Sequence, residues 1–295
     1  MHTSRSTRFL PLLLLGFALL SHVSHAQENP YFVTYDDHME ETGNLEVSTQ
    51  STIGLQKQHL PTFYAPYMEM EYGWNGWWTS EVYLESAAQS GNAVFTGWRF
   101  ENRFKPLQRE HWINPLLYFE FEDINEASRI RKEIVGNAEV TDESLSELRH
   151  NKAREVEGKL ILSSNVHNWN ISENFIVEKN TSAPEPTEFG YAFGISRPLA
   201  TLASGRDCSF CRENFRAGVE LYGGLGTTNS FGLWHTAQYV APGFVWQINP
   251  SNSVKVSTGF GLSSLSDRML LRFGYTYEIA GFGNRVKQAF THKKD

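Results

Sequence analysis

The chain has 295 residues, with 26 lysines and arginines against 33 aspartates and glutamates, so its formal net charge is −7. This acidic balance argues against nucleic acid as a partner, because phosphate backbones are bound through surplus lysine and arginine. Aromatic residues make up 14% of the chain, yet no apolar run beyond the first 26 residues approaches the roughly 18 residues of a membrane-spanning helix. A membrane protein that crosses the bilayer with strands satisfies both observations.

The N-terminus has the pattern of a secretory signal peptide. Arg5 and Arg8 precede the apolar run Phe9–Leu20, and small residues lead to a cleavage site at Ala26. The apolar run is too short to span a bilayer, so an uncleaved anchor is the less favoured alternative. We expect residues 1–26 to be removed, which leaves a mature chain with a net charge of −9.

Residues 27–43 form an acidic segment ahead of the first predicted strand. The run from Asp36 to Glu41 contains four carboxylates, which could bind a hard cation through oxygen ligands. A flexible acidic lead-in on the periplasmic side is the favoured interpretation.

From Gly43 onward, about twelve segments alternate apolar with polar residues and are separated by turn signals, which is typical of strands. In the segment 93–104, Val94, Trp98, Phe100 and Phe104 share one face, and the charged residues share the other. The alternation predicts one polar face across the sheet, which carries Glu69, Glu71, Glu81, Glu85, Arg99, Glu101, Arg103, Glu120, Glu122, Arg216, Glu220, Lys255 and Arg272.

Turn lengths indicate how the strands are arranged. Tight turns at Asn75-Gly76, His167-Asn168 and 249–252 fall on one side of the predicted sheet, whereas the polar stretch 123–153 falls on the other. Within that stretch, residues 141–150 predict a short helix with Thr141 as its N-cap. Short turns, one longer outer loop and an even strand number are habits of outer-membrane barrels. An open sheet edge in hydrocarbon would leave backbone groups unpaired, so we predict a closed, all-β, antiparallel transmembrane barrel over residues 44–279, with a tail at 280–295.

The last predicted strand resembles the terminal insertion signal of bacterial outer-membrane barrels. Arg272, Gly274, Tyr277 and Ile279 fill its polar, glycine and hydrophobic places. The resemblance implies that the barrel-assembly machinery recognises residues 272–279. The chain departs from the usual pattern because it continues for sixteen residues to Asp295.

A second resemblance lies at the start of the mature chain. The stretch Tyr31–Val47 ends in the pattern Glu-x-Gly-x-x-Glu and is similar to the opening of a group of poorly characterised barrels, among them the meta-pathway phenol-degradation transport proteins. It covers fewer than twenty residues. We therefore carry over the architecture and not the substrate class.

Cys208 and Cys211 are the only cysteines. In an oxidising compartment their spacing favours a disulfide over a redox-active or metal-binding pair. The histidines lack metal-ligand spacing, and neither His167 nor His235 is followed by the serine that a lipid hydrolase of this type would need. We expect no enzymatic activity, no metal and no cofactor.

These observations lead to one favoured function and two alternatives. The favoured one is passive passage or uptake of a small solute across the outer membrane of a Gram-negative bacterium, with the charged lumen setting selectivity. Arginines of the fourth strand are flanked by carboxylates on both neighbouring strands, so the same charges could simply fill the barrel. A closed structural or adhesion barrel that acts through its outer loop, and a soluble secreted β-sandwich, are the alternatives.

Overall fold

The structure is a computed structural model that describes residues 28–57, 59–129, 135–138, 142–202 and 208–291. The predicted signal peptide and its cleavage site at Ala26 lie outside the described residues.

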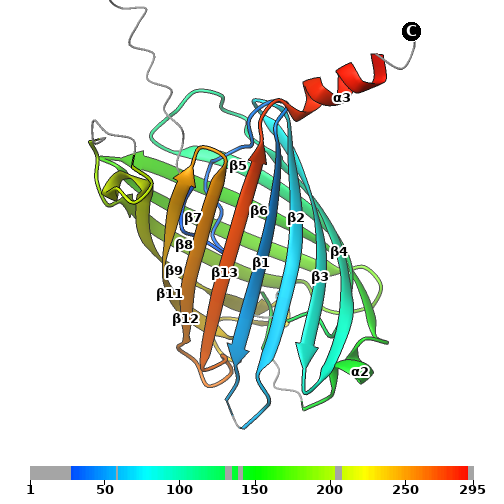
Figure 1. Cartoon of the computed structure of the whole chain (residues 1–295). Helices are drawn as coiled ribbons and strands as arrows, with labels where there is room; N and C mark the ends of the chain where they lie inside the picture. The colour runs from blue at the N-terminus through cyan, green and yellow to red at the C-terminus, as the bar shows by residue number, and fades with distance from the viewer. Residues whose placement is uncertain (1–27, 58, 130–134, 139–141, 203–207, 292–295) are drawn as a thin grey trace, which may run out of the picture.

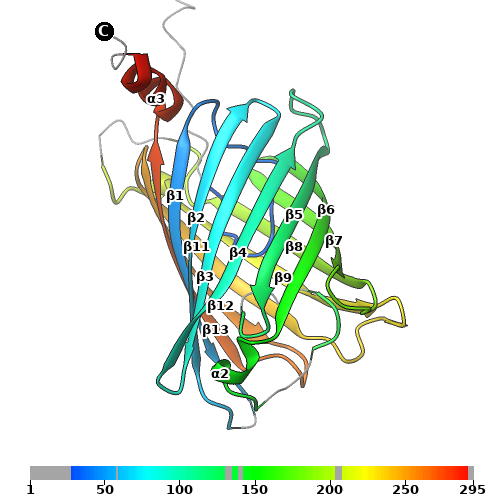
Figure 2. The ribbon, with the colours of Figure 1, turned by 90° about the vertical axis from the view of Figure 1, so that its right-hand side faces the viewer.

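The described chain forms a closed antiparallel barrel (Figures 1 and 2). Each strand pairs with its neighbours in the sequence, and pairing of the last strand with the first, from Leu45 opposite Ile279 to Leu55 opposite Met269, closes the sheet. The two-residue strand β10 (Ser230–Phe231) pairs antiparallel with the end of β9 and is not one of the barrel strands. The barrel strands are β1 (Leu45–Leu55), β2 (Phe63–Asn75), β3 (Trp78–Gln89), β4 (Asn92–Phe104), β5 (Asn114–Asn125), β6 (Lys152–Val166), β7 (Trp169–Asn180), β8 (Glu188–Pro198), β9 (Phe215–Thr227), β11 (Gln238–Asn249), β12 (Asn252–Gly261) and β13 (Met269–Ile279). The predicted all-β barrel of twelve strands is therefore confirmed.

Alternation along the strands separates an apolar outer face from a polar inner face. On β5, Phe119 is 53% exposed, whereas Tyr118 and Glu120 are 0% and 2% exposed. Successive side chains of a strand point to opposite faces, so every second residue enters the lumen. The outer face is therefore the reverse of that of a soluble protein, with its large apolar side chains directed away from the molecule.

The predicted outward position of Val94 on β4 is wrong because this strand contains a β-bulge. Glu85 pairs with Gly97 and the next residue, Ser86, pairs with Phe95, so one residue of β4 is skipped. Gly97 has a φ of +145° there. The bulge reverses the alternation, so that Val94 packs against the buried Leu145 inside the barrel end, while Trp98 faces outward.

The two ends of the barrel differ. The end where β13 finishes carries the predicted tight turns, with residues 76–77, 167–168 and 250–251 between strands, and we call it the α3 end. The described residues between β5 and β6, 126–129, 135–138 and 142–151, lie at the opposite end, which we call the α2 end. It contains the short helix α2 (Leu145–Leu148), whose N-cap is Ser144 with a capping box to Glu147. The predicted cap, Thr141, lies outside the described residues.

The N-terminal segment, residues 28–42, does not stay outside the barrel as the predicted acidic lead-in would. It folds back into the lumen, visible as the blue strap inside the strands in Figures 1 and 2. Tyr35 donates its backbone N–H to the Asn174 side chain on β7 over 2.6 Å, and Asn174 donates back to the Tyr35 carbonyl over 2.8 Å. The segment fits inside because the lumen wall offers polar side chains that satisfy its backbone.

After β13 the chain forms the helix α3 (Phe282–Thr291), which projects from the barrel rim. The sequence had predicted only a tail there. No helix in the described part of the chain has the length and apolar character needed to cross a membrane.

Candidate functional site in the barrel lumen

The candidate site begins with an unbroken row of glutamates on the inner wall. Direct cross-strand pairs join a glutamate on each of nine neighbouring strands, from β13 through β1 to β8. Because β13 ends at the α3 end and β8 begins at the α2 end, the row follows the barrel from one end to the other. We call it the glutamate row; its members are Glu278, Glu46, Glu71, Glu81, Glu101, Glu120, Glu157, Glu178 and Glu188.

Three cationic side chains from the wall lie against this row. Arg103 on β4 contacts Glu71, Glu81 and Glu101, with 3.1 Å from its Nε to the Glu101 Oε1. Its guanidinium therefore draws three carboxylates of successive strands together.

The other two cations continue the pattern toward β6. Arg99 bonds Glu85 at 2.5 Å and Glu120 at 3.3 Å, and Lys159 bonds Glu157 at 2.8 Å. Like-charged neighbours repel across a strand pair, so these cations are what allows so many carboxylates to share one face.

Tyrosine rings line the cations and hold the N-terminal segment. The Lys159 ammonium lies 4.0 Å from the Tyr118 ring centre and 4.7 Å from that of Tyr35. Arg99 lies over Tyr83 at 4.3 Å, and the Tyr83 hydroxyl donates to Glu101 over 2.8 Å. Carboxylates and aromatic faces together form an environment suited to positive charge.

The predicted lumen residues on later strands bind the N-terminal segment. Glu220 on β9 accepts backbone N–H bonds from Phe32, Val33 and Thr34 at 3.0, 2.9 and 2.7 Å. Lys255 on β12 forms an ion pair with Glu28 at 3.4 Å. One carboxylate thus binds the backbone of three consecutive residues, 32–34, which we call the tip of the N-terminal segment.

Two predicted arginines have different surroundings. Arg216 donates to the Asn29 side chain over 2.5 Å, at the beginning of the N-terminal segment. Arg272 donates to the Tyr222 hydroxyl over 2.5 Å and lies across the Tyr222 ring. Glu122 on β5 lies directly opposite Arg99, and Glu69 on β2 lies opposite Tyr83, which is itself opposite Arg99, so both stand at the level of Arg99 beside the row.

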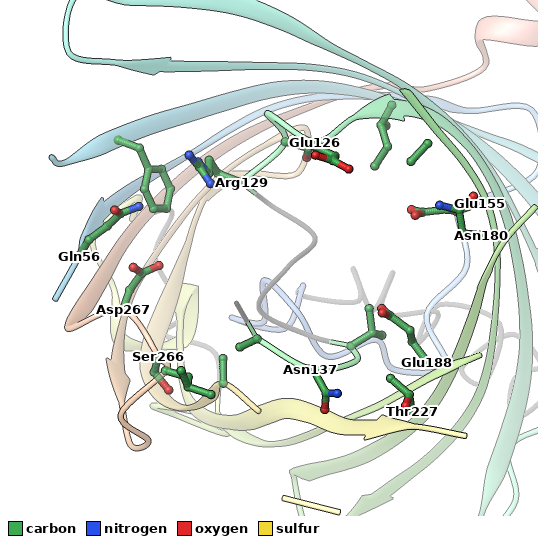
Figure 3. A pocket seen from close by; sticks show the side chains of 18 of the residues that line it. Gln56, Glu126, Arg129, Asn137, Glu155, Asn180, Glu188, Thr227, Ser266 and Asp267 are labelled. Carbon is green, nitrogen blue, oxygen red and sulfur yellow. The ribbon is translucent and has the colours of Figure 1, made fainter. Parts of the chain in front are cut away.

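Two cavities occupy the lumen. The one at the α3 end has a volume of about 670 Å³ and is lined by the N-terminal segment and by Glu46, Glu71 and Glu81 of the glutamate row. The one at the α2 end, shown in Figure 3, has a volume of about 450 Å³ and includes Glu126, Glu155 and Glu188 in its wall. In both cavities, acidic side chains outnumber basic ones among the described lining residues.

An apolar layer separates the two cavities, which share no lining residue. Phe63 and Tyr239 line the α2-end cavity, while Phe32 and Val33 at the tip of the N-terminal segment line the other, and all four pack in one cluster. The N-terminal segment therefore contributes directly to the apolar layer between the two cavities.

Loop residues complete the α2-end cavity. Gly136 donates its N–H to the Phe189 carbonyl over 3.1 Å and Ala138 donates to the His235 carbonyl over 2.8 Å, so these loop residues are bound to the wall at β8 and just before β11. Asp267 faces the same cavity, and its burial raises the pKa of its carboxyl group. The predicted outer loop thus lines the lumen rather than standing clear of it.

Sets of three carboxylates come close enough to share a cation. Oxygens of Glu46, Glu69 and Glu71 lie within 4.8 Å of one another, and so do those of Glu122, Glu155 and Glu178. All of them face the lumen, whereas the acidic run at 36–41 that suggested a cation site in the sequence is not among these sets. Hard cations favour such oxygen ligands.

Cys208 and Cys211 form the predicted disulfide in the loop that follows β8. Between them, Phe210 is 72% exposed and packs on Trp246, with 4.4 Å between ring centres. This loop lies at the α3 end, outside the lumen, so the disulfide takes no part in the candidate site.

No protein-family model matches the chain, and no curated protein matches its sequence. A solved outer-membrane channel from Pseudomonas putida F1 is similar with a TM-score of 0.54 at 8% identity, over 84% of this chain and 100% of that one. The chain has the fold of a bacterial outer-membrane barrel. The KdgM porin in complex with disordered oligogalacturonate gives a TM-score of 0.49 at 9% identity, over 79% of this chain and 98% of that one, and the NanC porin gives 0.47 at 10%, over 80% and 100%.

Proposed function

We propose that the protein is an outer-membrane channel for the passive passage of a small solute, and that its lumen favours cations. The observation that carries this proposal is the glutamate row, which follows the wall from the α3 end to the α2 end. Rings of carboxylates are a recurrent device of cation-selective pores.

The surplus of negative charge gives the physical reason. Among the described residues, Arg99, Arg103 and Lys159 contact five glutamates of the row, and acidic side chains outnumber basic ones in the described lining of both cavities. Carboxylates facing a narrow, low-dielectric lumen focus a negative potential there, which raises the local concentration of cations and repels anions.

Passage requires the apolar layer to open. Phe32 and Val33 belong to the N-terminal segment, so a shift of this segment would join the two cavities without rearranging the barrel strands. The proposed channel is therefore closed in the described arrangement and opens when the segment moves.

The proposal extends to location and assembly. The outer apolar face and the disulfide support an outer-membrane site reached after removal of the signal peptide near Ala26, with lipid around the strands. Recognition of Arg272–Ile279 by the barrel-assembly machinery remains a prediction, as does the absence of enzymatic activity. The meta-pathway resemblance also stays at the level of architecture.

The test is the reversal potential of single channels in a planar bilayer under a KCl gradient. We expect the mature protein to pass K⁺ in preference to Cl⁻, and Glu120→Gln with Glu157→Gln to reduce that preference. Arg99→Gln should increase it, because Glu85 and Glu120 would then lack their cation. Asp123→Asn is the matched control, since Asp123 is on the outer face of β5 with the exposed Arg154 as partner.

A closed barrel is the second candidate, and the apolar layer favours it. If refolded, heat-modifiable protein conducts nothing, even after the N-terminal segment is loosened, then the charges fill the lumen and function resides in the loops. Anion selectivity that is unchanged by the glutamate variants would refute the cation proposal and leave a channel.

A further inference from the structure

The helix α3 has no buried residue, although its sequence is strongly two-sided. At 3.6 residues per turn, Phe282, Val286 and Phe290 fall on one face of the helix. Phe290 is 71% exposed. An apolar face of this kind is stable only when something covers it.

The start of α3 is fixed to the barrel rim. Gly281 donates its N–H to the Asn44 side chain over 2.8 Å, and Gly283 donates to the Gly43 carbonyl over 2.9 Å. Gly281 has a φ of +65°, which turns the chain out of β13 and away from the lumen. The direction of α3 is therefore determined by contacts with the seam between β1 and β13.

The apolar face of α3 continues an aromatic belt on the barrel. Phe282 meets the Tyr72 ring edge to face at 6.4 Å, and Tyr72 in turn meets Trp74 at 4.8 Å. Trp74 is 51% exposed and stacks on Trp78 at 5.4 Å. Exposed tryptophans and tyrosines at one end of a barrel mark the level of the membrane interface.

Charge on α3 also points to a membrane surface. Arg285 and Lys287 lie on either side of the apolar face, and the helix contains no acidic residue. Long cationic side chains in these positions can keep their stems on apolar surface while the charges reach lipid headgroups. The sequence after the helix adds Lys293 and Lys294.

We propose that α3 is an interfacial helix that lies on the bilayer at the α3 end of the barrel. Its apolar face enters the boundary between headgroups and acyl chains, and Arg285 and Lys287 bind anionic phospholipid headgroups. The helix thereby braces the closing seam of the barrel against the membrane surface. Neither the helix nor its lipid contact is part of the conducting lumen.

The test uses nitroxide labels on the mature full-length protein in phosphatidylcholine vesicles, with and without phosphatidylglycerol. The chain's own two cysteines are joined in the disulfide, so one introduced cysteine is labelled selectively. We compare Phe290→Cys with Gln288→Cys, which lies on the opposite, uncharged face. Accessibility to oxygen and to a water-soluble nickel complex is measured for each label.

We expect the label at position 290 to be accessible to oxygen and protected from nickel, and the label at 288 to show the reverse. Phosphatidylglycerol should increase the protection at 290 severalfold, and Arg285→Glu with Lys287→Glu should abolish that increase. Equal nickel accessibility at both positions would refute the proposal. Protection at 290 that disappears when protein is diluted in lipid would also refute it, because it would indicate contact with a second copy.

Discussion

Replacing Glu220 by glutamine should release the N-terminal segment from the lumen. The Glu220 carboxylate accepts three backbone N–H bonds, from Phe32 at 3.0 Å, Val33 at 2.9 Å and Thr34 at 2.7 Å. Glutamine keeps one acceptor oxygen and places an N–H group opposite one of the three donors. One charge-assisted bond is then lost and two become neutral bonds, which are roughly half as strong.

The expected cost is about 3–6 kcal/mol, given that a hydrogen bond to a charged group contributes about 1.5–3 kcal/mol. At about 1.4 kcal/mol for each tenfold change, the equilibrium shifts toward the released segment by roughly 140- to 20,000-fold. Other contacts, including the Asn174 and Lys255 pairs, are unchanged and keep the segment near its site.

Two assays measure the shift. The fraction of time that single channels conduct should rise, and chymotrypsin should cleave after Phe32 and Tyr35 faster in detergent. Glu173→Gln is the control, because Glu173 is exposed on the outer face of β7. If the Glu220→Gln protein shows an unchanged conducting fraction and an unchanged cleavage rate, then Glu220 does not hold the N-terminal segment in the lumen. The proposed opening of the channel by movement of this segment would then be wrong.

Three further predictions concern pH and stability. Burial, with Glu71 and Glu278 nearby, raises the pKa of Glu40 in the N-terminal segment from 4.5 to about 8. The docked segment thus binds more protons than the released one, so docking should weaken as pH rises from about 4.5 to about 8, and Glu40→Gln should flatten this dependence of channel opening. Arg103→Ala should lower the unfolding free energy by about 3–5 kcal/mol, because Glu71, Glu81 and Glu101 lose their shared cation. Urea unfolding in detergent measures this loss. A loss no larger than that caused by Arg103→Lys would contradict the prediction. Gly97→Ala should cost about 1–3 kcal/mol, since φ is +145° and a Cβ would lie 2.2 Å from the Asp123 carbonyl oxygen, whereas Gly76→Ala, with open space around its Cβ, should be neutral.

The barrel and its inner face could be predicted because a strand has only two faces. Once Phe119 and Phe121 are assigned to the outside, the period of two sends Glu120 and Glu122 inside. The same reasoning failed at Val94, because the bulge inserts one residue into the alternation. An isolated glycine inside a strand pattern, here Gly97, is the signal that could have indicated it.

The position of the N-terminal segment could not be predicted from its composition. Its acidic residues suggest a solvated tail, and its partners Glu220 and Asn174 lie far away in the sequence. The sequence feature that could have indicated a buried position is the apolar run at Tyr31, Phe32 and Val33, because a solvated tail is rarely apolar over three consecutive residues. A segment that combines such a run with many polar groups fits a polar lumen better than it fits water.

The glutamate row explains why the candidate site depends on the fold and not on any local motif. The sequence shows a glutamate on most strands, but whether Glu101 stands level with Glu81 or with Glu85 depends on the turn between β3 and β4 and on the bulge. A slip of two residues would place Arg103 or Arg99 opposite the neighbouring carboxylate and give alternating charges, which is the more stable arrangement on a sheet. The observed register instead sets glutamate beside glutamate over nine strands. That arrangement costs stability, and it is the arrangement that the proposed cation-selective lumen requires.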